Sequence, residues 1–142
     1  MSEQPDASSP WRPIHAPGMA EPIGYANAIL SEGGRRLTLA GQIDMGPDGE
    51  VVNPGDLGAQ AAGAFKNIAR LLEEAGARPQ HLVRMRIFVV DINDYKARAK
   101  DIGRAYREHF GRWFPAMTLV QIVKLYDDGA LIEVESEAVI PD

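Results

Sequence analysis

The sequence predicts an α+β domain in which two amphipathic helices cover one face of a mixed β-sheet. Three observations support this fold class. Apolar residues recur with helical spacing in two segments, alternate with period two in several short segments, and make up 45% of the 142 residues, against 25% charged residues. A chain of this length is the size of one ordinary domain. The expected element order is β-β-β-α-β-α-β-β, because a sheet with both helices on one face buries both helical stripes.

The first 22 residues contain five of the ten prolines and show little periodicity. Proline fixes one backbone angle and lacks an N–H donor, so it disfavours regular elements. We therefore expect residues 1–22 to form an extended N-terminal arm and residues 23–142 to form the single domain.

Three short strands are expected after the arm. Apolar stretches over residues 24–31 and 36–42 flank the glycine-containing segment 32–35, a pattern typical of a β-hairpin. The Pro-Asp-Gly turn at residues 47–49 predicts a third strand over residues 50–52.

A helix and a strand follow. Asp56 is a suitable N-cap, and apolar residues recur at three- and four-residue spacing until Gly76, which predicts a helix between them. Residues 82–91 predict a strand with two different faces, and we expect the face of Val83 to contact the helices.

The second helix is expected to begin at Asn93 or Asp94 and to end at Gly111. The last two strands are expected over residues 116–124 and 130–139. The tight turn at residues 127–129 predicts that these two strands form a hairpin.

Composition and charge exclude several classes of protein. The chain has 15 basic and 20 acidic residues, a net charge of −5, which disfavours binding to nucleic acids and to anionic membranes. It has no cysteine, which excludes disulfides and zinc-thiolate sites, and its histidines lack metal-ligand spacing. No apolar run is long enough for a signal sequence or a membrane span. We therefore expect a soluble cytoplasmic protein without a metal site.

Carboxylates recur on the last strand. Glu133, Glu135 and Glu137 are expected on one face because side chains alternate along a strand. This face is either a solvated edge or a contact with another subunit, where one carboxylate stays in a cleft to transfer a proton or orient water. Arg84 and Arg86 share a strand face too, so we expect one of them to pair with a carboxylate of the last strand.

Several segments together resemble the RidA/YjgF family. The matching segments are Leu39-Ala40-Gly41-Gln42-Ile43, the helix that ends Glu74-Ala75-Gly76-Ala77, Phe88-Val89-Val90-Asp91 with Asn93-Asp94-Tyr95, Phe114-Pro115-Ala116, and Ile132-Glu133-Val134-Glu135. The resemblance covers residues 24–139. It implies a chorismate-mutase-like α+β fold, assembled as a homotrimer whose sheets form a central barrel, with a ligand cleft at each subunit interface. We expect the sheet face opposite the helices to form that interface.

The resemblance also implies an activity. Active members of the family hydrolyse reactive enamines and imines to 2-oxo acids and ammonia without metal or cofactor. A glutamate that orients water is matched by Glu133, with Glu135 as the fallback, and a tyrosine that lines the pocket is matched by Tyr25. Gly41 and Leu119 are also expected to line the substrate site.

Two positions depart from the family pattern. The arginine that clamps the substrate carboxylate is replaced by Met117, and a serine before Gly41 is replaced by Ala40. Methionine has no charge and no donor hydrogen, so it cannot hold a carboxylate. The sequence therefore favours a deaminase of altered specificity, unless Arg84 or Arg86 supplies the clamp. A metabolite-binding or regulatory trimer is the alternative, and RNA cleavage is the least favoured function because the chain is acidic.

Overall fold

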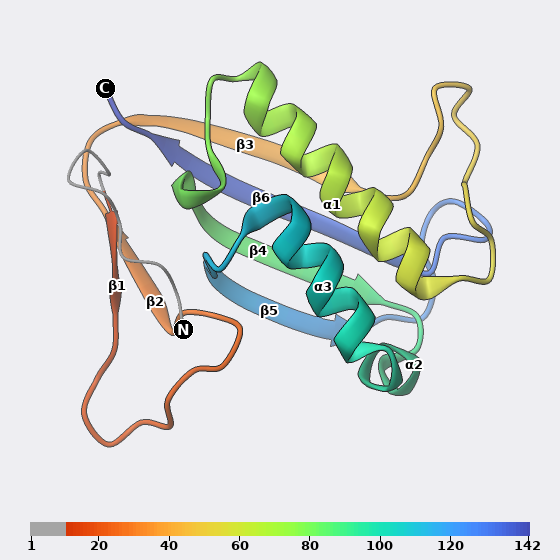
Figure 1. Cartoon of the computed structure of the whole chain (residues 1–142), viewed down its shortest axis with the longest axis horizontal. Coiled ribbons are helices and arrows are strands. Elements are labelled where there is room, and N and C mark those ends of the chain that lie inside the picture. Colours follow the sequence, from red (N-terminus) through yellow and green to blue (C-terminus); the bar gives the residue numbers. More distant parts are fainter. Residues whose placement is uncertain (1–10) are drawn as a thin grey trace.

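The computed structural model describes residues 11–142 and contains a four-stranded mixed sheet with its helices on one face (Figure 1). The strand order is β3-β6-β4-β5, with β4 and β5 parallel and the other neighbours antiparallel. These strands are β3 (Arg35–Gln42), β4 (Leu82–Val89), β5 (Ala116–Gln121) and β6 (Ile132–Ile140). The α+β fold class is confirmed. Within residues 11–142, no helix is long and apolar enough to cross a membrane.

The first predicted helix is confirmed as α1 (Leu57–Glu74). The Asp56 carboxylate accepts a hydrogen bond of 3.0 Å from the Ala59 N–H, which caps the first turn. Gly76 follows the last turn with a φ of 73°, a left-handed angle that glycine adopts without strain. The apolar stripe of α1 packs on the sheet and holds the helix in place.

The second predicted helix is two helices, α2 (Ile92–Ala97) and α3 (Ala99–Phe110). Arg98 separates them with φ −105° and ψ 16°, outside the helical region. The first cap is Asp91, whose carboxylate accepts hydrogen bonds from two N–H groups, so the predicted cap at Asn93 or Asp94 is wrong. The apolar period continues across the break, and for this reason spacing alone predicts one helix.

Both predicted hairpins are wrong. Strand β2 (Ala28–Ser31) pairs with β1 (Trp11–Ile14) instead of β3, and together they form a separate two-stranded sheet (Figure 1). β5 and β6 are not neighbours either, because β4 lies between them. A turn reverses the direction of the chain but does not determine whether the strands before and after it pair with each other. Here β6 lies between β3 and β4, inside the sheet.

Two smaller expectations also need correction. Residues 50–52 form no strand; Val51 makes only an isolated bridge with Met45. Val83 does not face the helices, because the pairing of β4 with β6 shifts register between Leu82 and Arg84. Leu82 is buried there instead, and the rest of the strand alternates as expected.

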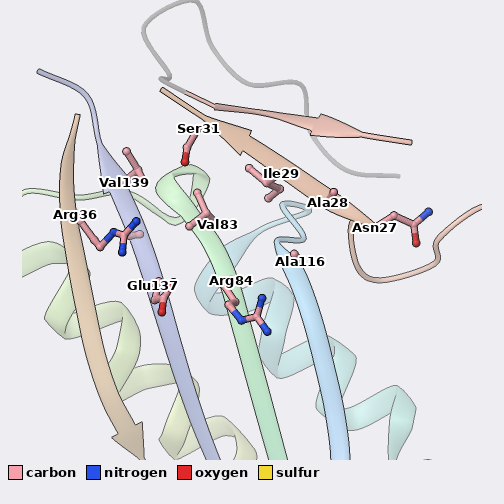
Figure 2. Close-up of a pocket in the computed structure, with 11 residues that line it drawn as sticks. Asn27, Ala28, Ile29, Ser31, Arg36, Val83, Arg84, Ala116, Glu137 and Val139 are labelled. Atoms are coloured by element: carbon pink, nitrogen blue, oxygen red, sulfur yellow. The ribbon is translucent and has the colours of Figure 1, made fainter. Parts of the chain in front are cut away.

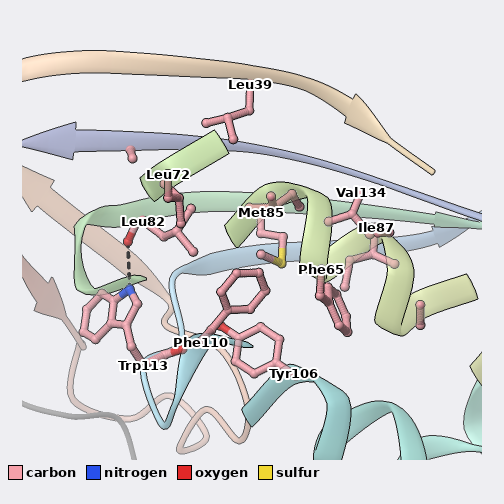
Figure 3. Close-up of a cluster of buried hydrophobic side chains, with 14 of the residues drawn as sticks. Leu39, Phe65, Leu72, Leu82, Met85, Ile87, Tyr106, Phe110, Trp113 and Val134 are labelled. Atoms are coloured by element: carbon pink, nitrogen blue, oxygen red, sulfur yellow. Dashed lines mark hydrogen bonds between the residues drawn. The ribbon is translucent and has the colours of Figure 1, made fainter. Parts of the chain in front are cut away.

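Aromatic residues fill one end of the core between the helices and the sheet (Figure 3). The Trp113 indole N–H donates to the Leu82 carbonyl at 2.8 Å, and the Tyr106 hydroxyl donates to the Trp113 carbonyl at 2.5 Å. Trp11 of β1 packs on Trp113 with ring centroids 4.1 Å apart. Part of the predicted extended arm is therefore a strand that is fastened to the core. The domain boundary at residue 23 stays a prediction.

Candidate functional site

The three glutamates of β6 lie on the helix-free face of the sheet. Glu133, Glu135 and Glu137 are half-buried, whereas the residues that alternate with them are buried toward the helices. Arg86 of β4 shares this face, and its Nη1 donates to Glu135 Oε1 at 2.8 Å. The expected pairing of one arginine with a carboxylate of the last strand is thus confirmed within a single chain. Arg86 is consequently committed to Glu135 and does not serve as a free clamp.

Gly41 and Glu133 lie in direct contact. The pairing of β3 with β6 is irregular between Leu39 and Gln42, and the Glu133 side chain lies over the Gly41 backbone at this point. A Cβ atom on Gly41 would lie 2.8 Å from Glu133 Cδ, closer than such atoms approach in proteins. Ala40 is exposed beside them. The structure therefore brings together three of the residues that the sequence singles out: Ala40, Gly41 and Glu133.

A second group of predicted site residues lies at the edge strand β5. Tyr25, Met117 and Leu119 line a cavity of about 310 Å³ together with Gly24, Ile87 and Tyr95. Met117 is paired in register with Met85, and Leu119 with Ile87. Because Met85 and Ile87 are buried toward the helices, Met117 and Leu119 point to the helix side of the sheet.

A larger apolar cavity of about 490 Å³ adjoins the first and shares Gly24, Ile87, Tyr95 and Met117 with it. It extends toward α3. Its remaining lining residues are Ile23, Phe65, Ala99, Ile102, Gly103, Tyr106, Arg107 and Phe114. Within the described part of the chain, Arg107 is the only charged residue that lines either cavity. The space around Met117 is therefore mainly apolar.

Two phenols in this region stay protonated at neutral pH. Burial raises the pKa of Tyr95 above its usual value, and burial raises the pKa of Tyr106 still further. Tyr106 uses its hydroxyl hydrogen on the Trp113 carbonyl. Tyr95 lines both cavities, where its hydroxyl can donate a hydrogen bond. Because the phenol keeps its proton at neutral pH, no phenolate is present to act as a general base.

The predicted site residues thus form two groups in one chain. Glu133 faces the helix-free side from β6, whereas Met117 faces the helix side from β5, and β4 lies between the two strands. The family resemblance implies one cleft at each subunit interface, and the structure of one chain leaves that expectation a prediction. Tyr95, which lines both cavities, was not singled out as a site residue by the sequence, since it continues the apolar stripe of the helices. Within residues 11–142, no three histidine, aspartate or glutamate side chains are placed to hold a metal ion.

Comparisons with known proteins agree with the fold and the motifs. The family model described as "Endoribonuclease L-PSP" matches residues 15–140. A RutC family protein of Pasteurella multocida is 34% identical over 89% of this chain and 95% of its own length. The human 2-iminobutanoate/2-iminopropanoate deaminase is 31% identical over 87% of this chain and 84% of its own length.

Solved structures show the same relationship. A Rid family protein of unknown function from Yersinia pestis, YyfB, superposes with a TM-score of 0.81 at 30% identity, over 92% of this chain and 99% of that one. The YjgF gene product of E. coli superposes with a TM-score of 0.64 at 28% identity, over 97% and 98% of the two chains. The match to the family model and these relatives show that the chain belongs to the endoribonuclease L-PSP family, also called the RidA/YjgF family.

Proposed function

We propose that the chain is a deaminase that hydrolyses a reactive enamine or imine whose recognition does not depend on a carboxylate. The observation that carries this proposal is the lining of the cavity at β5. Tyr25, Met117 and Leu119 meet there without any charged side chain. Relatives named 2-iminobutanoate/2-iminopropanoate deaminase support the reaction class. The apolar lining supports a substrate with an uncharged group in place of the carboxylate.

The reaction needs a group that activates water. Water adds to the carbon of the C=N bond, the nitrogen gains protons, and the C–N bond breaks to give a carbonyl compound and ammonia. Glu133 is our candidate for this role, because its half-buried carboxylate can accept the proton that water loses and return it to the nitrogen. Glu135 is the weaker candidate, since Arg86 occupies its Oε1.

We further propose a homotrimer with one active site at each subunit boundary. Glu133 and Met117 lie on opposite faces of one sheet, so a single chain does not bring them to one substrate. A neighbouring chain that packs against the edge strand β5 supplies the missing Glu133. Large apolar side chains support such an assembly, because Val120 of β5 and Val123 and Tyr126 beyond it are exposed.

The activity is tested with imines generated in the assay. An amine oxidase supplies an uncharged imine, an amino-acid oxidase supplies a carboxylated one, and semicarbazide traps whatever the protein does not consume. We expect ammonia release and loss of the semicarbazone with the uncharged imine, and slow turnover of the carboxylated one. Rapid turnover of the carboxylated imine would contradict the specificity. Arg107 would then be the first candidate clamp, and Arg107→Gln should abolish that turnover.

The shared site is tested by mixing two inactive variants. Glu133→Gln removes the proposed base, and Tyr25→Ala damages the cavity at β5. After the chains are mixed and reassembled, about a quarter of the boundaries should combine an intact cavity with an intact glutamate and regain activity. No recovery in a mixture shown by light scattering to be trimeric would place both groups in one chain. A monomer at micromolar concentration would exclude the trimer.

A metabolite-binding or regulatory trimer is the second candidate. It is favoured by the absence of a cation from the lining of the cavity that holds Met117 and Tyr25. Saturable binding of an apolar imine analogue without ammonia release, in the wild type as well as in Glu133→Gln, would select this function over the enzymatic one.

A further inference from the structure

A separate cavity of about 340 Å³ lies on the helix-free face, where β2 lies across one end of the main sheet (Figure 2). It is lined by Asn27, Ala28, Ile29, Ser31, Arg36, Val83, Arg84, Ala116, Glu137, Ala138 and Val139. None of these residues lines the two cavities around Met117. The register shift in β4 forms part of the wall, because it turns Val83 toward β2 and away from the helices.

Two arginines in this cavity have no partner in the described part of the chain. The side chains of Arg36 on β3 and Arg84 on β4 form neither a hydrogen bond nor an ion pair with any residue of 11–142, in contrast to that of Arg86, which is bonded to Glu135. Figure 2 shows their guanidinium groups on the two sides of Glu137. Arg84 is the register neighbour of Glu137, yet the two are not within ion-pair distance.

The charges of the cavity leave a positive excess. Among the described residues 11–142, Glu137 is the only carboxylate that lines the cavity, against two guanidinium groups. One carboxylate cannot satisfy two arginines, each of which carries five donors in a planar fork. A cavity of this volume is at the lower end of the range for small-molecule sites, about 300 to 1,000 Å³.

We infer that this cavity binds a small oxyanion, a carboxylate or a phosphate, between Arg36 and Arg84. Both groups have the planar or branched oxygen arrangement that guanidinium forks match with two hydrogen bonds. Ser31 adds a hydroxyl that can donate a third. The cavity is lined by residues of one chain, on the sheet face that we expect to meet other subunits, and it does not depend on deaminase activity. It differs in place and in charge from the apolar cavity at β5.

The test uses the intact protein and two probes, inorganic phosphate and succinate. Each is added in a thermal unfolding experiment and in calorimetry, with sodium chloride at matched ionic strength as the blank. We expect saturable binding of at least one probe, with one anion per chain and a raised melting temperature. Tighter binding of phosphate would indicate a phosphorylated ligand, and tighter binding of succinate a carboxylate.

Variants assign the binding to this cavity. Arg36→Gln and Arg84→Gln should each weaken binding about tenfold or more, because each removes a charged hydrogen-bond donor. Glu137→Gln should strengthen it, since that change removes the only negative charge. The matched control is Arg70→Gln on the exposed side of α1, which loses the same charge without touching the cavity and should bind like the wild type.

Two outcomes would overturn the inference. One is a probe effect no larger than that of sodium chloride. The other is equal binding by Arg84→Gln and Arg70→Gln. If the glutamine variants fail to fold, Arg36→Lys and Arg84→Lys keep the charge and lose only the fork. Binding that these lysine variants leave unchanged would then reject guanidinium recognition at this site.

Discussion

Arg86 on β4 donates a 2.8 Å hydrogen bond to Glu135 on β6, directly across the strand pair. The three glutamates of β6 have three different surroundings. Glu135 is paired with Arg86, and Glu133 lies over the backbone of Gly41. Glu137 lies beside two arginines whose side chains have no partner within residues 11–142. The same residue type, repeated at every second position, thus meets an arginine, a glycine backbone and a cavity with two further arginines.

The Arg86–Glu135 bond should contribute only modestly to stability, because both side chains are about one-third exposed. A double-mutant cycle with Arg86→Gln and Glu135→Gln is expected to give a coupling energy of about 0.2 to 1 kcal/mol that shrinks in high salt. Urea unfolding measures it. Arg84 and Glu137 are the matched pair, register neighbours without a bond, and their cycle should give a coupling near zero. Equal coupling for both pairs would contradict the assignment.

Met117→Arg should improve turnover of carboxylated imines. The new guanidinium restores a charged hydrogen bond worth about 1.5 to 3 kcal/mol, which corresponds to about tenfold to a hundredfold in rate. Kinetics with an amino-acid oxidase as the imine source measure the gain. Glu133→Gln in the same chain should cancel it. Met19→Arg adds the same charge on an exposed loop and should leave turnover unchanged. A gain in Met19→Arg would show a general charge effect.

Gly41→Ala should reduce activity much more than it reduces stability. The added Cβ collides with the side chain of Glu133, which can rotate away at low cost and so leaves its position for catalysis. We expect a loss of free energy of unfolding of about 1 kcal/mol or less, and a loss of turnover close to that of Glu133→Gln.

The control for this change is Gly63→Ala on α1. Its Cβ would collide with Asp44, which is buried and accepts a 2.8 Å hydrogen bond from Asn53. Asp44 therefore cannot move as cheaply, and we expect a loss of about 1 to 3 kcal/mol. If Gly41→Ala keeps full activity, Glu133 does not need its position over Gly41.

Stability at alkaline pH should depend on Tyr106. Burial raises the pKa of its phenol above the unfolded value of about 10, so the folded chain holds this proton more tightly. The resulting stability is complete below pH 10 and falls as the pH rises beyond it. Tyr106→Phe should flatten this fall between about pH 9.5 and 11.5, at the cost of the hydrogen bond to Trp113 at neutral pH. Urea unfolding across the pH range tests it. Tyr126→Phe is the control, since Tyr126 is almost fully exposed and its loss should leave the slope unchanged.

Local patterns predict the elements of this protein well. The cap at Asp56 and the glycine at position 76 bound α1 correctly, because a cap and a left-handed glycine act on their immediate neighbours. The alternation of β6 placed its three glutamates on one face for the same reason. The same patterns predict the α+β class, and the family resemblance implies the same fold.

The candidate site shows where sequence reasoning ends. Whether Met117 and Glu133 share a face depends on the pairing of β5 with β4, which joins residues about thirty positions apart. Pairing of this kind is decided by which strands bury best together, so no local signal specifies it. The grouping of Arg36 with Arg84 was equally hidden, since their strands, β3 and β4, flank β6 only in the folded sheet.

The last three residues of the loop between β1 and Ala26, at positions 23–25, line the apolar cavities. The loop is fastened at both ends, by Trp11 on Trp113 and by a 2.9 Å bond from the Ala26 N–H to the Pro115 carbonyl. Between these points nearly every residue is exposed, including Ile23 and Tyr25, which line the cavities. In segments with so few buried contacts, the free energy of local opening is a small fraction of the free energy of global unfolding. We therefore expect this surface loop to open, and with it the cavities, while the sheet and the aromatic core stay closed.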